Sequence, residues 1–514
     1  MGRGTRVKKT KTINMKNIYH KLFSLLLVFL FLPMIQEHLN VININPLKGV
    51  TYKTEKPKFT FDSCYEGKYQ AQLEKYISEN FGFKEIAIRL YNQYIWTCFK
   101  KTYNKSFQKG KDNWFYYHRA CREFKGFEYR SHFKTREEAI ANYEKNITMM
   151  CQLRGILKEY GIEFMTFMGP DKPFIYPEYL PNKDTISKPL RAFEYYSKRF
   201  DEIGFPNIEM TQWFKAMRDT ISHPIMQTID SHWGVSAVYG CDSLLKYLNS
   251  LNDFGIPEIK YGKAIKTNKK PSYEEKVLNM IFPIIKKNYN YKMDIKVMNN
   301  ENTKKPRILF VGDSFIWAIN DYLPLQDILS DMEIWYYNST VHQGFNLNKK
   351  KKQDINALQS ILKSDYVVFY SCGHQWHEGT YNFLEETLNE FGVTDSTTNH
   401  DREKVKKLLL RIEIENDSVW NNKLLSYSLS NSIGIEDVYE VEINNVINGN
   451  TLLKDIIEID EESIFEYEVE KLIDSWRKNP KMMKSLEDKA MKKGKPLEVV
   501  IVEDARWVIK KNKK

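Results

Sequence analysis

One serine in the chain follows an apolar segment in the way that reactive serines do in α/β proteins. The segment Arg307–Val311 is short and apolar after its first residue, and it continues directly into Gly312-Asp313-Ser314. At the carboxyl end of such a strand, backbone N–H groups of the following turn can face a developing oxyanion. The same tripeptide also ends strands that have no catalytic role, so Ser314 becomes a candidate nucleophile only if the chain supplies a base.

The segment Asp230-Ser231-His232-Trp233 offers that base. A serine hydroxyl is a poor nucleophile until a histidine takes its proton, and a carboxylate beside the histidine orients the ring. If the segment is extended, residues two apart point to the same side, and Asp230 holds the nitrogen of His232 that faces away from Ser314. We therefore predict a catalytic triad of Ser314, His232 and Asp230. The alternatives are a surface turn with an unrelated histidine and a metal pair, for which no third ligand lies at a useful spacing.

Helices and strands alternate around these residues. One helix begins at a capping box formed by Thr135 and Glu138 and continues with apolar residues three or four apart to Leu157. A second helix is indicated over 235–248. Buried strands are indicated over 162–168, 307–311, 333–337 and 366–370. Strands separated by helices are typical of an α/β sheet with mostly parallel strands, and we place this catalytic domain at 111–392.

Two segments do not follow this alternation. Residues 249–305 are rich in Lys, Asn and Tyr with little periodicity, which indicates an elaborate loop or insertion over the sheet. Residues 393–514 are strongly charged and have a helical pattern. We expect a separate helical C-terminal region there and assign it no function.

The N-terminus has the layout of a membrane-targeting segment. Residues 1–21 carry seven basic side chains and no acidic one, and the apolar run 22–36 follows at once. No small-x-small cleavage site follows this run, which favours an uncleaved signal-anchor over a buried core helix. Because the basic end stays in the cytoplasm, we expect a single-pass protein of the inner membrane, with 37–110 as a membrane-proximal segment and the catalytic domain on the periplasmic side.

Charge and cysteine content exclude other classes. The net charge of +11 comes largely from basic clusters at the two chain ends, so nucleic-acid binding is not expected. The six cysteines have wide, irregular spacings that form no metal motif, and Cys151 and Cys241 fall on apolar helix faces where core residues are expected. We predict no metal site and no cofactor.

A specific resemblance arises from the two motifs together. Gly312-Asp-Ser-Phe315 after an apolar strand, with Asp230-x-His232-Trp233 upstream, resembles the alginate O-acetyltransferase family of AlgX/AlgJ type. Proteins of that family are SGNH-hydrolase-like, and they place the Asp/His block before the serine, as this chain does. Further segments of family type lie at 80–84, 110–116 and 170–178.

The resemblance implies a fold and an activity. The fold is a parallel sheet flanked by helices, with the triad in permuted order. The activity is transfer of an acetyl group through Ser314 to hydroxyls of a polysaccharide outside the cytoplasm, with a membrane-bound O-acyltransferase supplying the acetyl group. Two alternatives use the same chain differently: a carbohydrate acetylesterase with the same triad, or a non-catalytic membrane-tethered scaffold of a polysaccharide assembly complex.

The chain also departs from the family pattern on the second side of the expected site. After the strand at 366–370 the sequence continues Ser371-Cys372-Gly373-His374, without the glutamate that the family pattern has. We treat Lys172, Tyr370 and His374 as candidate substrate-binding residues.

Overall fold

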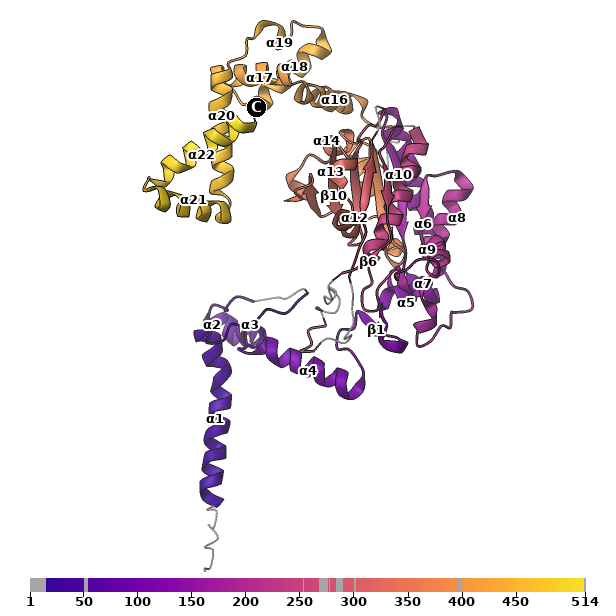
Figure 1. Cartoon of the computed structure of the whole chain (residues 1–514), viewed down its shortest axis with the longest axis vertical. Helices are drawn as coiled ribbons and strands as arrows, with labels where there is room; N and C mark the ends of the chain where they lie inside the picture. The colour runs from indigo at the N-terminus through magenta and orange to yellow at the C-terminus, as the bar shows by residue number, and fades with distance from the viewer. Residues whose placement is uncertain are drawn as a thin grey trace, which may run out of the picture.

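The computed structural model describes residues 15–49, 54–252, 254–267, 276, 278–282, 290–299, 302–394 and 399–512. Three parts follow one another along the chain: an N-terminal helical segment, a domain built on a central sheet, and a helical C-terminal region (Figure 1). Residues 1–14 of the basic tail expected at 1–21 lie outside the described residues.

The central sheet has seven strands in the order β12-β11-β10-β9-β13-β3-β4. Five of them pair in parallel, which confirms the expected α/β class. At one edge β11 pairs antiparallel with both β10 and β12, which makes the sheet mixed. The strands are β3 (Glu163–Gly169), β4 (Asn207–Glu209), β9 (Arg307–Gly312), β10 (Asp331–Tyr336), β11 (Thr340–Gln343), β12 (Asn348–Lys351) and β13 (Tyr366–Cys372).

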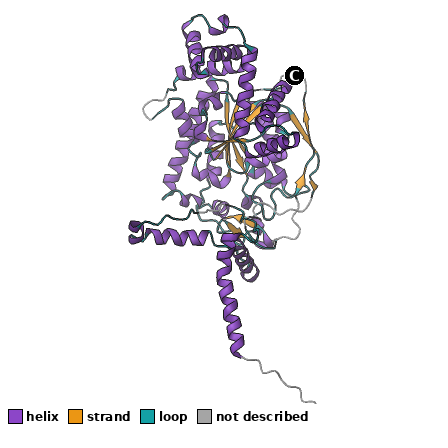
Figure 2. Cartoon of the chain, turned by 90° about the vertical axis from the view of Figure 1, so that its left-hand side faces the viewer, coloured by secondary structure: helices purple, strands orange, loops and turns teal. Residues whose placement is uncertain are grey.

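Helices cover both faces of this sheet (Figures 1 and 2). Successive strand residues point to opposite faces, so Phe369 packs in one core and Tyr370 in the other. One core is covered by α6 (Arg136–Glu159), α8 (Ala192–Ile203), α14 (Ala357–Leu362) and α15 (Phe383–Glu390). The other is covered by α9 (Thr211–Met217), α10 (Ala237–Asn252), α12 (Ile316–Tyr322) and α13 (Leu325–Ile328).

Helix α6 begins where the capping box predicts. The Thr135 hydroxyl accepts a hydrogen bond from the Glu138 backbone N–H at 3.1 Å, while the Glu138 carboxylate accepts from Lys134 rather than from Thr135. The expectation of a buried Cys151 is wrong, because this side chain lies on the solvent side of α6, whereas Cys241 on α10 is buried.

The strands and short helices at the domain's edges include several that the sequence did not indicate. The insertion at 249–305 is not simply a loop: its described residues form two small antiparallel pairs, β5 (Glu258–Tyr261) with β8 (Ile295–Met298) and β6 (Ile265–Lys266) with β7 (Tyr291–Lys292). The domain opens with β1 (Phe107–Lys109), β2 (Phe115–Tyr117) and α5 (His118–Lys125), and α7 (Lys172–Ile175) follows β3.

The N-terminal segment consists of one long helix and three shorter ones. They are α1 (Met15–Leu39), α2 (Phe61–Tyr65), α3 (Lys68–Glu79) and α4 (Lys84–Phe99). The apolar run 22–36 lies within α1. The 21 residues Tyr19–Leu39 of this helix form a segment that is long and apolar enough to span a membrane. In Figure 1, α1 points away from the sheet domain, and α4 runs across its direction.

The C-terminal region is helical, as expected. Its first helix contributes Val405 and Ile412 to one of the sheet cores, and the helices of the region also pack around two small apolar clusters of their own. They are α16 (Arg402–Asn416), α17 (Ser418–Asn431), α18 (Ile435–Asn448), α19 (Leu453–Ile456), α20 (Glu461–Arg477), α21 (Pro480–Lys493) and α22 (Leu497–Asn512).

Candidate active site

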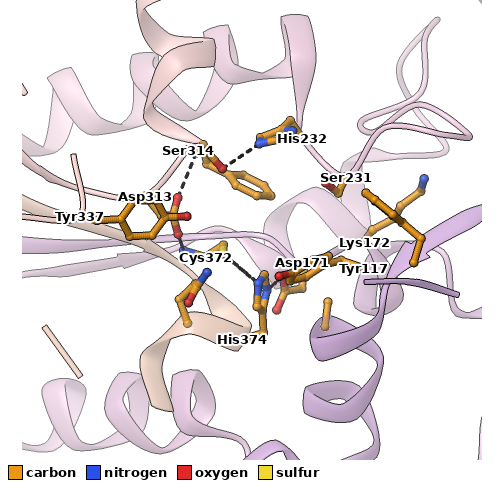
Figure 3. A pocket seen from close by; sticks show the side chains of 14 residues that line it. Tyr117, Asp171, Lys172, Ser231, His232, Asp313, Ser314, Tyr337, Cys372 and His374 are labelled. Carbon is orange, nitrogen blue, oxygen red and sulfur yellow. Dashed lines mark hydrogen bonds and ion pairs between the residues drawn. The ribbon is translucent and has the colours of Figure 1, made fainter. Parts of the chain in front are cut away.

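The carboxyl ends of four parallel strands meet beside one cavity of about 190 Å³. Strands β3, β9, β10 and β13 end at this edge of the sheet, and the residues that follow them form much of the cavity wall (Figure 3). Among the lining residues are Tyr117, Asp171, Lys172, Ser231, His232, Asp313, Ser314, Tyr337, Cys372 and His374. This is the edge at which parallel α/β sheets place their ligands.

The structure brings Ser314, His232 and Asp230 together. The Ser314 Oγ lies 2.9 Å from Nε2 of His232, and Nδ1 of His232 lies 3.2 Å from Oδ1 of Asp230. All three side chains are only partly buried, so solvent reaches them. With Nδ1 protonated toward Asp230, Nε2 has a lone pair directed at the serine hydroxyl, which is the arrangement required of a general base.

The loop that carries His232 is not extended, which corrects the expectation from the sequence. It consists of bends and a 3-10 turn before α10. Asp230 still reaches His232 because its Oδ1 also accepts a hydrogen bond from the His232 backbone N–H at 3.0 Å. The carboxylate therefore braces both the loop and the ring.

Lys172 holds this loop through hydrogen bonds to its backbone. Its side chain is buried, and its Nζ donates to the backbone carbonyls of Phe115, Gln227, Thr228 and Asp230 at 2.6–2.9 Å. An ammonium group engaged with four carbonyls is held in place at the end of the Asp230 loop. The geometry favours this structural role over the substrate contact expected from the sequence.

Asp313 and Gly312 shape the turn that presents Ser314. The buried Asp313 carboxylate accepts hydrogen bonds from the backbone N–H groups of Phe315 at 3.0 Å and Cys372 at 2.8 Å, which ties β9 to β13. A Cβ on Gly312 would lie 2.2 Å from the Tyr370 carbonyl oxygen, so only glycine fits there. Burial raises the pKa of Asp313.

Tyr337 is a cavity residue that the sequence reasoning missed. It follows β10 with φ +48°, a left-handed conformation that is costly for a tyrosine, and its side chain lines the cavity together with Ser314. Burial, and then the Asp313 charge, raise the pKa of Tyr337, so its hydroxyl stays protonated and can donate. Its position directly after a predicted strand was the available signal.

His374 forms a second histidine–carboxylate pair on the far wall of the cavity (Figure 3). Its Nδ1 lies 2.7 Å from Oδ1 of Asp171, and both residues are almost fully buried. Burial opposes a charge on His374, but the Asp171 carboxylate outweighs it and raises the pKa of the imidazole. Asp171 was not singled out in the sequence, although it directly follows the first predicted strand and its Gly-Pro turn.

Cys372 lies between the two walls. Its Sγ is 3.5 Å from Nδ1 of His374, and donor atoms of Asp171, Cys372 and His374 all lie within 4.8 Å of one another. Burial raises the pKa of the Cys372 thiol well above its usual value, which favours the protonated form in this environment.

Tyr370 does not line the cavity. Its ring is fully buried against Phe167 and Trp233 on the α10 side of the sheet. Within the described residues its hydroxyl has no hydrogen-bond partner. The pleat of β13 directs Tyr370 into the core, so the geometry gives it a packing role in place of the expected substrate contact.

Comparison with known proteins supports the resemblance. Residues 107–273 match the family described as SGNH hydrolase-like domain, acetyltransferase AlgX. The match includes Asp230 and His232 and ends before Ser314. No curated protein sequence matches the chain.

Three solved structures are similar at low identity. AlgX of Pseudomonas aeruginosa is 11% identical, with 55% of this chain and 67% of that chain covered and a TM-score of 0.32. The O-acetyltransferase domain of Pseudomonas putida AlgJ is 13% identical, with 59% and 98% covered and a TM-score of 0.30. PatB1 of Bacillus cereus, solved with a sulfonyl adduct, is 13% identical, with 54% and 99% covered and a TM-score of 0.35.

Proposed function

We propose that the chain is an O-acetyltransferase that moves an acetyl group, through an acyl-serine intermediate on Ser314, to hydroxyls of a polysaccharide. The observation that carries the proposal is the 2.9 Å contact between Ser314 and His232 in the cavity at the carboxyl edge of the sheet. The AlgX-type match over 107–273, which includes His232 and Asp230, supports acetyl transfer as the reaction.

In the first half-reaction, His232 takes the Ser314 proton through Nε2 while Oγ attacks the acetyl carbonyl carbon of the donor. Asp230 balances the charge that develops on the imidazole. The carbonyl oxygen becomes an oxyanion, for which the backbone N–H of Ser314 and the protonated Tyr337 hydroxyl are the nearby donors, since the Phe315 N–H is engaged by Asp313. The donor's leaving group departs with the proton from His232, and acetyl-Ser314 remains.

In the second half-reaction, His232 deprotonates a sugar hydroxyl, which attacks the acetyl-serine carbonyl. The oxyanion collapses, the new sugar ester leaves, and Ser314 recovers its proton from His232. A cavity of about 190 Å³ accommodates an acetyl group and the reacting end of an acceptor rather than a whole sugar chain. The polysaccharide therefore lies along the cavity mouth and presents one hydroxyl.

A location outside the cytoplasm is part of the proposal. Helix α1 is long and apolar enough to span a membrane; if it crosses the inner membrane once with its basic N-terminal end in the cytoplasm, the sheet domain is extracytoplasmic. A cell-surface or exported polysaccharide is the acceptor available there. A membrane-bound O-acyltransferase would carry the acetyl group across the membrane to this site.

The test uses the full chain in detergent, with a chromogenic acetyl ester as donor and intact-mass detection of the enzyme. We expect turnover and a transient mass increase of one acetyl group in the wild type, both lost in Ser314→Ala and His232→Ala. Ser250→Ala, an exposed serine on α10, is the matched control and should behave like the wild type. Absence of both turnover and adduct in the wild type would favour the scaffold alternative.

A second measurement separates transferase from esterase, since the same triad serves both. Acetyl-enzyme is mixed with polysaccharide acceptors, and the products are followed by mass spectrometry. Acetylated glycan identifies a transferase, whereas free acetate at an unchanged rate with every acceptor identifies an esterase.

A further inference from the structure

One side of helix α4 presents an apolar stripe to the outside of the molecule. The stripe consists of residues on one side of the helix that are all exposed: Ala87, Leu90, Tyr91, Tyr94 and Cys98. The three large side chains among them are each at least half exposed. No charged residue interrupts the stripe. A helix of a soluble domain normally turns such a face inward, so this one needs a covering.

The opposite side of α4 is the side that faces protein. Arg89 donates to the carbonyls of Asn45 and Pro46 at 2.8 and 2.9 Å, and Asn92 donates to the Leu278 carbonyl at 2.9 Å. Trp96 packs against Phe115 of the sheet domain, with ring centroids 5.5 Å apart. This side of α4 therefore contacts the rest of the protein, and the apolar stripe points away from these contacts.

The start of α4 is fixed at the outer end of α1. The backbone of Gly82 packs so tightly on α1 that a Cβ there would lie 2.0 Å from the Pro33 carbonyl oxygen. Tyr76 of α3 donates to the Glu37 carboxylate at 3.2 Å. Figures 1 and 2 show α3 and α4 extending sideways from this end of α1 while the sheet domain stands on the other side of them.

The charge and the aromatic content of α4 and of the residues that follow it match a lipid surface. Residues 86–111 include six basic residues and no acidic one. Phe99 and Tyr103, directly after the stripe, are more than half exposed and stack edge-on against Tyr94 and Tyr91. Tyrosine side chains concentrate at membrane interfaces, and basic residues beside them attract anionic headgroups.

We propose that α4 lies flat in the headgroup region of the bilayer that α1 crosses, with its apolar stripe toward the acyl chains. The basic residues that follow α4, Lys100, Lys101 and Lys105, then contact anionic lipid headgroups. Because α4 is held to α1 at one end and to the sheet domain through Asn92 and Trp96, it fixes the height and tilt of the catalytic cavity above the membrane. The proposal rests on α1 spanning the membrane and is independent of the acetyl chemistry.

The native cysteines allow a direct test in the full chain. Cys98 is exposed on the stripe, Cys151 is exposed on α6 of the sheet domain, and Cys121, Cys241 and Cys372 are buried. Changing Cys64 and Cys151 to serine leaves Cys98 as the reactive position, and changing Cys64 and Cys98 to serine leaves Cys151. Each protein is labelled with a small fluorophore and reconstituted into vesicles of phosphatidylcholine and phosphatidylglycerol without any other protein.

We expect nitroxide-labelled lipid to quench the Cys98 fluorophore severalfold more than the Cys151 fluorophore, and aqueous iodide to do the reverse. Adding Tyr94→Glu should restore iodide quenching at Cys98, while Ile203→Glu on α8, an exposed apolar position away from the stripe, should not. Omitting phosphatidylglycerol should weaken lipid quenching at Cys98. Equal iodide access at Cys98 and Cys151 would overturn the proposal and indicate that a protein partner covers the stripe.

Discussion

The cavity holds two histidine–aspartate pairs that differ in their access to water. The side chains of His232 and Asp230 are 28% and 23% exposed, whereas those of His374 and Asp171 are 6% and 3% exposed. The exposed pair lies on a loop and contacts the Ser314 hydroxyl. The buried pair comes from the ends of two neighbouring strands, β3 and β13, and contacts no hydroxyl nucleophile in the described part of the chain.

We expect this difference in exposure to separate a pair that exchanges protons from one that holds its proton more tightly. A general base must lose and regain its proton in every cycle, which partial exposure permits. The Asp171 carboxylate raises the pKa of the buried His374 imidazole, so this ring holds its proton more tightly, and the ion pair contributes to the stability of the fold and to the electrostatic environment of the cavity. We therefore expect changes at the first pair to act on rate and changes at the second to act on stability.

Removing the two imidazoles gives the largest contrast. His232→Ala should lower the rate of Ser314 acetylation by roughly 10⁴-fold or more, because the hydroxyl then has no base. His374→Gln should lower it by less than about tenfold, since the triad geometry is untouched. Single-turnover acetylation followed by intact mass compares them. Equal losses in both variants would show that the buried pair also takes part in the chemistry.

Asp230→Asn tests the orienting carboxylate. An amide favours the wrong imidazole tautomer, so acetylation should fall by roughly 10³-fold. Stability should change little, because the side chain is partly solvated. The readouts are the acetylation rate and the urea midpoint of the same preparation. A large drop in the midpoint would mean that Asp230 mainly holds the loop through the His232 backbone N–H.

Asp171→Asn is the matched change in the buried pair. It leaves a charged imidazole buried without its counter-ion, and breaking such a pair costs about 3 kcal/mol of unfolding free energy. Hydrogen exchange of β13 should accelerate together with the loss of global stability. Comparison with Asp230→Asn is the control, and a stable Asp171→Asn variant would show that His374 is neutral in the folded protein.

The sequence was informative where local pattern determines structure. The four-residue apolar run before Gly312, the capping box at Thr135 and the Asp-x-His motif identified an α/β sheet and the residues that meet in its cavity. Each of these signals lies within a few neighbouring residues, so no knowledge of long-range packing was needed.

Long-range contacts account for what was missed. Nothing near Lys172 in the sequence indicates that its ammonium meets carbonyls 55 to 58 residues away. Tyr337 reaches Ser314 only because β10 pairs with β9, and Asp171 reaches His374 only because β3 pairs with β13. The exposed side of α4 was also hidden, since an apolar stripe predicts a helix face but not which side faces protein.

The smallest expected effect is the pH dependence of the stability that the buried pair contributes. The direction of the His374 pKa shift determines the sign of this dependence. Since the folded protein has a raised His374 pKa, folding takes up a proton at pH values above the unfolded pKa of about 6.5. The contribution to stability is therefore complete below that pH and is lost as the pH rises through the folded pKa. Asp313 and Cys372, which also face His374, are retained in both proteins compared.

The measurement is the difference in unfolding free energy between the wild type and His374→Gln from pH 6 to pH 9. We expect the wild type to lose its advantage toward pH 9. Asp171→Asn should abolish the pH dependence, because the carboxylate is what raises the pKa of His374 against the opposing effect of burial. A wild-type advantage that grew with pH would mean that burial dominates, and the buried pair would then be a neutral hydrogen bond.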